Sequence, residues 1–277
     1  MLAHVNFQKK NWNASSLTKL AFLLGFFFLS ACGKDDASEE PQAGSRSLIV
    51  KGVKNMKENN YEGAKMAFGE LLNRDINDLE ARSYMALLMA KQGRRRDAIM
   101  HAERVLEADP KRALPHAALG LVYFSANQFD RALEHSRKAL KANPDLPDPY
   151  LVIGEIYLRR GKVKKSLPVL KHALQLDPKN TEAYKKMAAA QIKADDYKAA
   201  FETLQKAMEI DPDIAGIHFN LALVYSEFND ADKAMHHIDT AERFYIRDDN
   251  SRWSAKTRQI KQLLAKKFKM RPEDIGG

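Results

Sequence analysis

Cysteine is almost absent from this sequence: Cys32 is the only one in 277 residues, which excludes a disulfide framework and a multi-cysteine metal site. Glycine and proline number only 13 and 10, too few for a collagen-like or low-complexity chain. The N-terminal apolar run, residues 20–31, is shorter than the roughly 18 residues that a membrane-spanning helix needs. Acidic residues are missing from 1–31, whereas 32–248 carries 34 basic and 33 acidic residues. The net charge of +9 therefore lies mostly at the two ends, which argues against nucleic-acid binding.

The N-terminus has the order of an export signal. Three lysines precede the apolar run, and small residues end it. The run closes with Leu29-Ser30-Ala31-Cys32, which resembles the bacterial lipobox. That resemblance implies cleavage of a signal peptide, residues 1–31, and attachment of lipid to Cys32. Gly33, rather than an aspartate, then implies sorting to the outer membrane facing the periplasm, with the inner membrane as the alternative. A plain signal peptide with an incidental cysteine is the other interpretation. The polar residues 32–44 are predicted to be a lipidated, disordered tether.

The middle of the chain repeats itself. Residues 45–248 divide into six blocks of 34 residues without an insertion. The eighth and twentieth positions of every block hold only Gly, Ala or Ser, and the thirty-second holds Pro in four of six. These residues resemble the tetratricopeptide repeat (TPR). The resemblance implies an all-α fold, a right-handed TPR solenoid of six helix-turn-helix repeats. Residues 249–277 are predicted to add a basic capping helix and tail, because Trp253, Ile260, Leu264 and Phe268 form one apolar stripe.

No catalytic motif is present. None of the eight histidines lies in an HExxH pattern or beside a cysteine, and no glycine-rich phosphate loop occurs. His116 and His218 both occupy the fourth position of a repeat, which favours a packing role over a metal site. We therefore predict a protein that is not an enzyme and that holds neither a cofactor nor a metal.

The TPR resemblance implies that the first helix of each repeat lines a concave groove. The groove residues that we predict to bind a partner are Ile49, Val53, Met56, Leu87, Leu121, Phe124, Leu151, Leu158, Lys185, Phe219 and Leu223. Lys185 and Asn220 match part of the family's carboxylate clamp, but the ninth positions do not, so we expect no clamp. A largely apolar groove suits an amphipathic or extended protein segment. The alternative is that repeat packing, or the chain's own tail, buries these side chains.

A lipoprotein with six such repeats resembles the pilotins of type IV pilus biogenesis. That resemblance implies a membrane-anchored periplasmic adaptor that assists secretin assembly. A scaffold that docks peptidoglycan hydrolases or other envelope complexes is the alternative. The basic C-terminal helix carries eight basic residues and no acid between Ser251 and Arg271. It is predicted either to present a solvated outer face or to contact anionic lipid, cell-wall polymer or an acidic partner.

Overall fold

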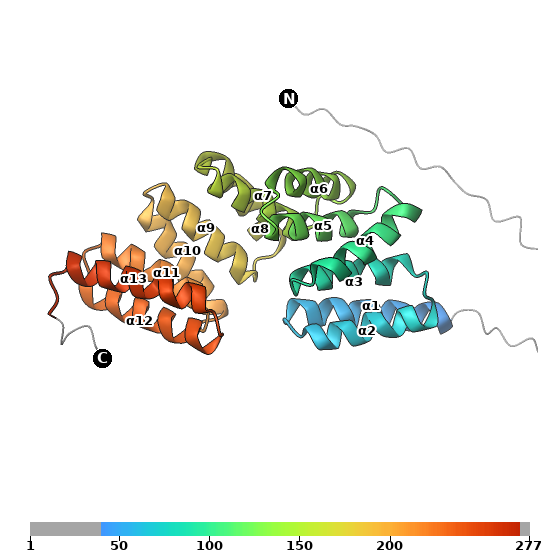
Figure 1. The fold of residues 1–277 in the computed structure, drawn as a ribbon, viewed down its shortest axis with the longest axis horizontal. Coiled ribbons are helices and arrows are strands. Elements are labelled where there is room, and N and C mark those ends of the chain that lie inside the picture. Colours follow the sequence, from blue (N-terminus) through green and yellow to red (C-terminus); the bar gives the residue numbers. More distant parts are fainter. Residues whose placement is uncertain (1–39, 272–277) are drawn as a thin grey trace, which may run out of the picture. The chain divides into compact units, whose positions relative to one another are not determined.

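The computed structural model describes residues 40–271, with side chains from residue 44 onward, and these residues form 13 α-helices and no strand (Figure 1). The helices are α1 (Glu40–Lys57), α2 (Tyr61–Arg74), α3 (Leu79–Lys91), α4 (Arg95–Ala108), α5 (Ala113–Ser125), α6 (Phe129–Ala142), α7 (Pro147–Arg159), α8 (Val163–Leu176), α9 (Thr181–Lys193), α10 (Tyr197–Ile210), α11 (Ala215–Glu227), α12 (Ala231–Arg247) and α13 (Ser251–Lys267). Helices α1 to α12 make six helix-turn-helix pairs, and α13 follows the sixth. The predicted all-α solenoid is confirmed.

The N-terminal boundary differs from the prediction. Helix α1 begins at Glu40, so residues 40–44, which we assigned to the tether, belong to the first helix. The physical reason is that Leu48, Ile49 and Val53 hold this helix against the first hydrophobic cluster, and the helix continues upstream from that anchored part. The predicted signal peptide, Cys32 and the tail after residue 271 lie outside the described residues.

Small residues let the two helices of each pair approach closely. A Cβ atom on Gly52 would overlap the Phe68 ring, and one on Gly154 would lie 2.6 Å from Leu170. At the twentieth position the alanines are buried, and Ser166 donates its hydroxyl to the Gly154 carbonyl at 2.7 Å. The small residues that marked the repeat in the sequence are therefore required by helix-helix contact.

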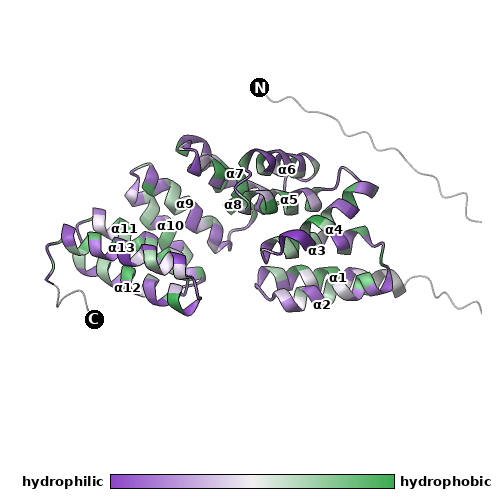
Figure 2. Ribbon diagram, in the orientation of Figure 1, coloured by the Kyte–Doolittle hydropathy of each residue, from purple (hydrophilic) through white to green (hydrophobic). Residues whose placement is uncertain are grey.

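Each pair also packs on the next one. The first helix of a pair contacts the preceding second helix and the preceding first helix, as seen for α3 with α5 and for α9 with α11. The largest fully buried side chains, among them Phe68, Leu88, Ile156, Leu204 and Ile238, lie within and between pairs. Figure 2 shows hydrophobic and hydrophilic residues mixed along every helix, as expected when one side of each is buried. The first helices consequently form a row of neighbours.

One residue in each repeat makes the turn between its helices. The fifteenth position is Asn59, Gly93, Asn127, Gly161, Asp195 and Asn229, and all six have positive φ. Glycine adopts this left-handed conformation freely, and Asn and Asp are the side chains that tolerate it best. The restriction of this position to Gly, Asn and Asp is visible in the sequence and is a further mark of the repeat.

An Asx turn ends five of the six second helices. The thirty-first position is Asp75, Asp109, Asn143, Asp177 and Asp211, and its side chain accepts the N–H two residues on at 2.9–3.4 Å. Proline follows four of these residues, but Ile76 follows Asp75 and α2 still ends there. Helix α12, with Tyr245 at this position, runs on to Arg247. The Asx residue, rather than the proline alone, thus accompanies the end of the helix.

Two histidine pairs lie inside repeats three and six. His116 Nε2 is 3.1 Å from the Pro110 carbonyl oxygen, and His116 Nδ1 is 3.1 Å from His135 Nδ1. A carbonyl only accepts, so His116 carries its proton on Nε2 and its Nδ1 accepts from the Nδ1–H of His135. Burial, followed by the influence of His116, lowers the pKa of His135 to about 4.

The second pair repeats this arrangement three repeats later. His218 Nε2 is 2.8 Å from the Pro212 carbonyl oxygen, and His218 Nδ1 is 2.9 Å from His237 Nδ1. Burial and the neighbouring His218 lower the pKa of His237 to about 4. His218 is 6% exposed and His116 is 7% exposed, which agrees with the interpretation of the fourth position as a packing position.

Candidate functional site

The candidate site is the surface formed by the first helices of the six repeats, here called the first-helix surface. Four of the predicted binding residues do not reach it, because Leu87, Leu151, Leu158 and Phe219 are only 5–7% exposed. Their side chains belong to the hydrophobic clusters between helices. The alternative that we considered from the sequence, burial by repeat packing, therefore holds for these four.

The other seven predicted residues keep part of their surface. They are Ile49, Val53, Met56, Leu121, Phe124, Lys185 and Leu223, and each is partly buried. Ile49, Val53 and Met56 pack against the cluster of repeats one and two, and Leu223 packs against the last cluster. Of the predicted binding residues, only the six apolar ones among these seven thus offer accessible apolar surface.

An aromatic pair with a cation above it lies in the middle of the chain. The Phe124 and Phe129 ring centroids are 6.0 Å apart, and the Arg159 guanidinium carbon is 4.7 Å from the Phe124 centroid. Arg159 is held there, because its Nε donates to Glu155 Oε1 at 3.0 Å and its Nη1 donates to Asn127 Oδ1 at 3.4 Å. Phe124 therefore presents an apolar surface beside a fixed positive charge.

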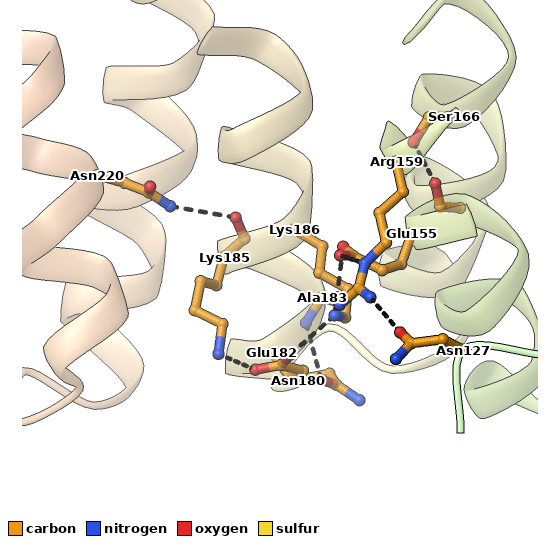
Figure 3. A network of polar contacts seen from close by, with 11 residues as sticks. Asn127, Glu155, Arg159, Ser166, Asn180, Glu182, Ala183, Lys185, Lys186 and Asn220 are labelled. Carbon is orange, nitrogen blue, oxygen red and sulfur yellow. Dashed lines mark hydrogen bonds and ion pairs between the residues drawn. The ribbon is translucent and has the colours of Figure 1, made fainter. Parts of the chain in front are cut away.

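Charged residues link the first helices α7 and α9 (Figure 3). Lys186 Nζ lies 3.5 Å from Glu155 Oε2 and 3.0 Å from Glu182 Oε1, and Glu182 also pairs with Lys185. Burial alone raises the pKa of Glu182, but the two ammonium groups outweigh it and lower the pKa to about 2. The pKa of Glu155 is lowered by Lys186 and Arg159 against the effect of its own burial. These carboxylates stay ionised at neutral pH.

A second ion pair spans a whole repeat. Lys91 Nζ of α3 lies 2.6 Å from Asp148 Oδ1 of α7, so the pair bypasses α5. Burial lowers the pKa of Lys91, but Asp148, with smaller contributions from Tyr61 and Asp177, outweighs it, and the net shift is upward. The contact connects repeats two and four directly.

The partial clamp pattern is used internally. Asn220 Nδ2 donates to the Lys185 backbone carbonyl at 3.3 Å, and Asn220 is 7% exposed. The Lys185 ammonium pairs with Glu182 of the same helix. Figure 3 shows the two side chains directed to these internal partners. Both polar groups that could grip a carboxylate are therefore already engaged.

Sequence reasoning missed part of the charged network. It predicted Lys185 as a binding residue, but it did not single out Asp148, Glu182 or Lys186. Asp148 and Glu182 are acids at the second position of a repeat, a groove position, and this was a usable signal. Their lysine partners could not be assigned from the sequence, because Lys91 and Asp148 are 57 residues apart.

Neither a metal site nor a membrane-spanning helix occurs within residues 40–271. No three His, Cys, Asp or Glu side chains gather as a metal-ligand set in this part of the chain. No described helix combines the length and the apolar composition needed to cross a bilayer. Cys32, the predicted lipid-attachment residue, lies outside the described residues.

Solved structures of other proteins share this architecture. PilF of Pseudomonas aeruginosa matches with a TM-score of 0.57 at 16% identity, over 79% of this chain and 100% of that one. Cut9 in the APC/C hetero-tetramer Cut9-Hcn1 matches with a TM-score of 0.58 at 15% identity, over 76% and 39% of the two chains. TTC0263, a TPR protein of Thermus thermophilus, matches with a TM-score of 0.52 at 20% identity, over 65% and 98%. A search of curated protein sequences gave no significant match.

Family models agree with these folds. One tetratricopeptide-repeat model matches residues 123–190 and 191–260, and a second matches residues 85–147. Together they run without a gap over more than half of the sequence. The chain therefore belongs to the tetratricopeptide-repeat family, whose fold is that of a protein-protein interaction scaffold.

Proposed function

We propose that this protein is a lipid-anchored, non-enzymatic adaptor of the bacterial envelope that binds a segment of a protein partner on its first-helix surface. The observation that carries the proposal is the row of first helices, which leaves partly exposed apolar side chains next to fixed charges. Phe124 and Leu121 are the centre of this arrangement, with Arg159 held over the Phe124 ring. Aromatic side chains, phenylalanine among them, and arginine are enriched in the buried parts of protein interfaces relative to the rest of the surface.

The chemistry of the surface defines the partner segment. Apolar side chains of an amphipathic helix or an extended strand would cover Leu121 and Phe124. Arg159 would sit at the edge of that contact, where a carboxylate or carbonyl of the partner could approach it. The internal use of Lys185 and Asn220 makes recognition of a free C-terminal carboxylate a poor fit. We therefore propose recognition of an internal segment.

A pair of double variants tests this surface. Leu121→Glu with Phe124→Glu should abolish capture of the partner, because two carboxylates would have to be buried against apolar groups. Met66→Glu with Met100→Glu is the matched control, since these exposed methionines lie on the second helices α2 and α4. Circular dichroism checks that both variants keep their helicity. Capture retained by the first variant, or lost equally in the control, would place binding elsewhere.

The membrane anchor is proposed from the lipobox at Cys32. Two or three acyl chains hold a protein stably on a membrane, whereas one holds it weakly. A Cys32→Ser variant should leave the membrane fraction after a salt wash, and metabolic labelling with palmitate should mark the wild type only. If the variant stays with the membrane, the anchor is not the lipid.

The proposed client is an outer-membrane secretin subunit of type IV pilus biogenesis. The lipobox together with six TPR repeats supports this proposal. Cells that lack the protein should show fewer secretin multimers on unheated gels, and the wild-type gene should restore them. Unchanged multimers would contradict the secretin proposal. Crosslinking in the native envelope then identifies the client. Recovery of peptidoglycan hydrolases would favour the alternative function, a scaffold that docks these enzymes.

A further inference from the structure

The terminal helix α13 has one side attached to the rest of the solenoid. Ser254, Thr257, Leu264 and Ala265 are buried, and Ile260 and Phe268 pack against the last hydrophobic cluster. This confirms the predicted apolar stripe for its later residues. The contacts of α13 are made with α12 and with residues of α11. The orientation of α13 about its axis is therefore well defined.

Three of its basic residues are used on the attached side. Arg258 Nε lies 2.6 Å from Glu242 Oε1, and Lys261 Nζ lies 2.6 Å from Asp239 Oδ1. Lys267 Nζ lies 3.2 Å from Glu227 Oε1 and donates to the Ser226 carbonyl at 2.8 Å. These cations hold α13 on acidic residues of the preceding repeat.

Of the other three basic residues of α13, Arg252 and Lys266 lie on the opposite side of the helix, and Lys256 starts there but places its Nζ 5.7 Å from the Phe219 ring of α11. The exposed residues of this outward stripe are Arg252, Lys256, Gln259, Leu263 and Lys266. Their spacings of four, three, four and three residues place them on one line along the helix. Helix α13 contains no acidic residue, and Leu263 is 56% exposed. Trp253, at 37% exposure, borders the stripe: its ring packs against Tyr245 and Phe219, and Lys256 Nζ lies 4.5 Å from it.

We propose that the outward stripe of α13 binds the surface of a membrane that contains anionic phospholipid. Lysine and arginine near such a surface are attracted to the lipid phosphates. An exposed leucine and a tryptophan are the side chains that enter the interface between headgroups and acyl chains. The stripe is straight and lies on one helix, a shape that matches a broad flat surface better than a bound peptide. This contact depends neither on lipid at Cys32 nor on the first-helix surface.

The stripe carries its own spectroscopic probe. The sequence has two tryptophans, Trp12 and Trp253, so a full-length Trp12→Phe variant leaves Trp253 alone. We expect its emission to shift to shorter wavelength on vesicles of phosphatidylglycerol and phosphatidylcholine, and brominated lipid to quench it. On phosphatidylcholine alone the same shift should need at least ten-fold more lipid. The readout is the environment of Trp253, so attachment of the chain through its N-terminal residues does not produce it.

Two triple variants, both made in the Trp12→Phe protein, distinguish the effect of the outward stripe from that of net charge. Arg252→Gln, Lys256→Gln and Lys266→Gln together should raise the lipid needed for half of the shift by about a hundred-fold, because each cation contributes about five-fold. Lys164→Gln, Lys165→Gln and Lys171→Gln remove three exposed lysines of α8 and should leave the value unchanged. Circular dichroism confirms that both variants remain helical.

Three outcomes would overturn the proposal. They are an equal shift on neutral and anionic vesicles, an equal loss in both triple variants, and no change of Trp253 emission on any vesicle. The last outcome would assign the stripe to solvation of the solenoid end or to an acidic protein.

Discussion

Lowering the pH from 7 to 4 should destabilise repeats three and six selectively. Each repeat contains a histidine pair in which the Nδ1–H of one imidazole donates to the Nδ1 of the other, and that bond needs the accepting imidazole, His116 or His218, to be neutral. A proton added to His116 or His218 would place two N–H groups against each other at about the distance of the present bond. Protonation of the accepting imidazole is therefore disfavoured while the helices stay packed, and burial disfavours protonation of the donating imidazole as well.

The magnitude follows from the pKa of the donor histidine in each pair. An ordinary histidine has a pKa of 6.5, and burial followed by the partner imidazole lowers that of His135 and His237 to about 4. Between pH 6.5 and 4 the unfolded chain takes up a proton that the folded repeat excludes, so stability is present above this window and is lost as the pH falls. Each pair then contributes about 3 kcal/mol to the loss, which corresponds to roughly a hundred-fold in local opening.

The charges around His135 act on this value in both directions. Lys138 and Arg131 on α6 lower the pKa of His135, and Glu134 raises it. His236, on the same helix, further lowers the pKa of His237. None of these neighbours exceeds burial as the cause, so the effect should persist at moderate salt.

Two measurements test the prediction. Imidazole resonances in a long-range proton-nitrogen correlation spectrum should give a pKa near 4 for His135 and His237, and Nε2 tautomers for His116 and His218. Hydrogen exchange, corrected for the intrinsic rate, should show amide protection in α6 and α12 falling about a hundred-fold between pH 6.5 and 4. The variants His135→Gln and His237→Gln, whose amide can still donate, should each remove this pH dependence in their own repeat only.

A matched control variant distinguishes the histidine pairs from a loss of stability at low pH that has other causes. His172→Gln removes a histidine that bonds to Gln175 and not to another histidine. If it abolishes the pH dependence as fully as His135→Gln does, the pairs are not the cause. A normal pKa for His135 and His237 in the folded protein would refute the reasoning outright.

Three further predictions concern packing, charge and turns. Gly52→Ala should lower the free energy of unfolding by about 1–3 kcal/mol, because the added Cβ meets the Phe68 ring. Gly69→Ala, at an open position of α2, should raise the free energy of unfolding by about 0.5–1 kcal/mol. Equal effects of the two variants in urea unfolding would contradict the contact with Phe68. A double-mutant cycle of Lys91→Gln and Asp148→Asn should give a coupling of about 1 kcal/mol that shrinks in 1 M NaCl, and a coupling of zero would show that the pair is not formed in solution. Asn229→Val should cost about 1–2 kcal/mol because of the positive φ at this position, and Asn229→Gly should be nearly neutral. A neutral valine would mean that the turn relaxes.

The repeat itself could be predicted because its packing leaves a mark at fixed positions. The twentieth-position residues are buried, and side chains such as Phe68 fill the space beside the eighth position, so only small residues fit there. The apolar stripe of the last helix was equally visible. Such features depend on contacts within one repeat or between sequence neighbours, and periodicity reports them directly.

The accessibility of the candidate site could not be predicted in the same way. Leu87 and Leu121 both occupy the ninth position, yet Leu87 is buried and Leu121 is only partly so. The difference depends on which side chains the adjacent repeats place around each leucine. Repeat position alone is the same for both. The pair of Lys91 and Asp148 was hidden for a related reason, since it depends on how repeats two and four approach each other.

The histidine pairs fall between these two cases. Their members are 19 residues apart, so no search for a local motif finds them. When the repeats are aligned, however, both pairs join position four to position twenty-three of the same repeat. Two histidines at these positions of one repeat therefore predict a contact. Repeat two supports the same geometry, because Arg82 at position four donates to the carbonyl of Ile76, as His116 does to that of Pro110. A backbone carbonyl that follows the end of a second helix has no partner within that helix and needs a hydrogen-bond donor. The side chain at the fourth position of the next repeat lies close enough to donate to it. Comparison of equivalent positions in aligned repeats therefore predicts these polar contacts between helices, although a search for local motifs along the chain does not.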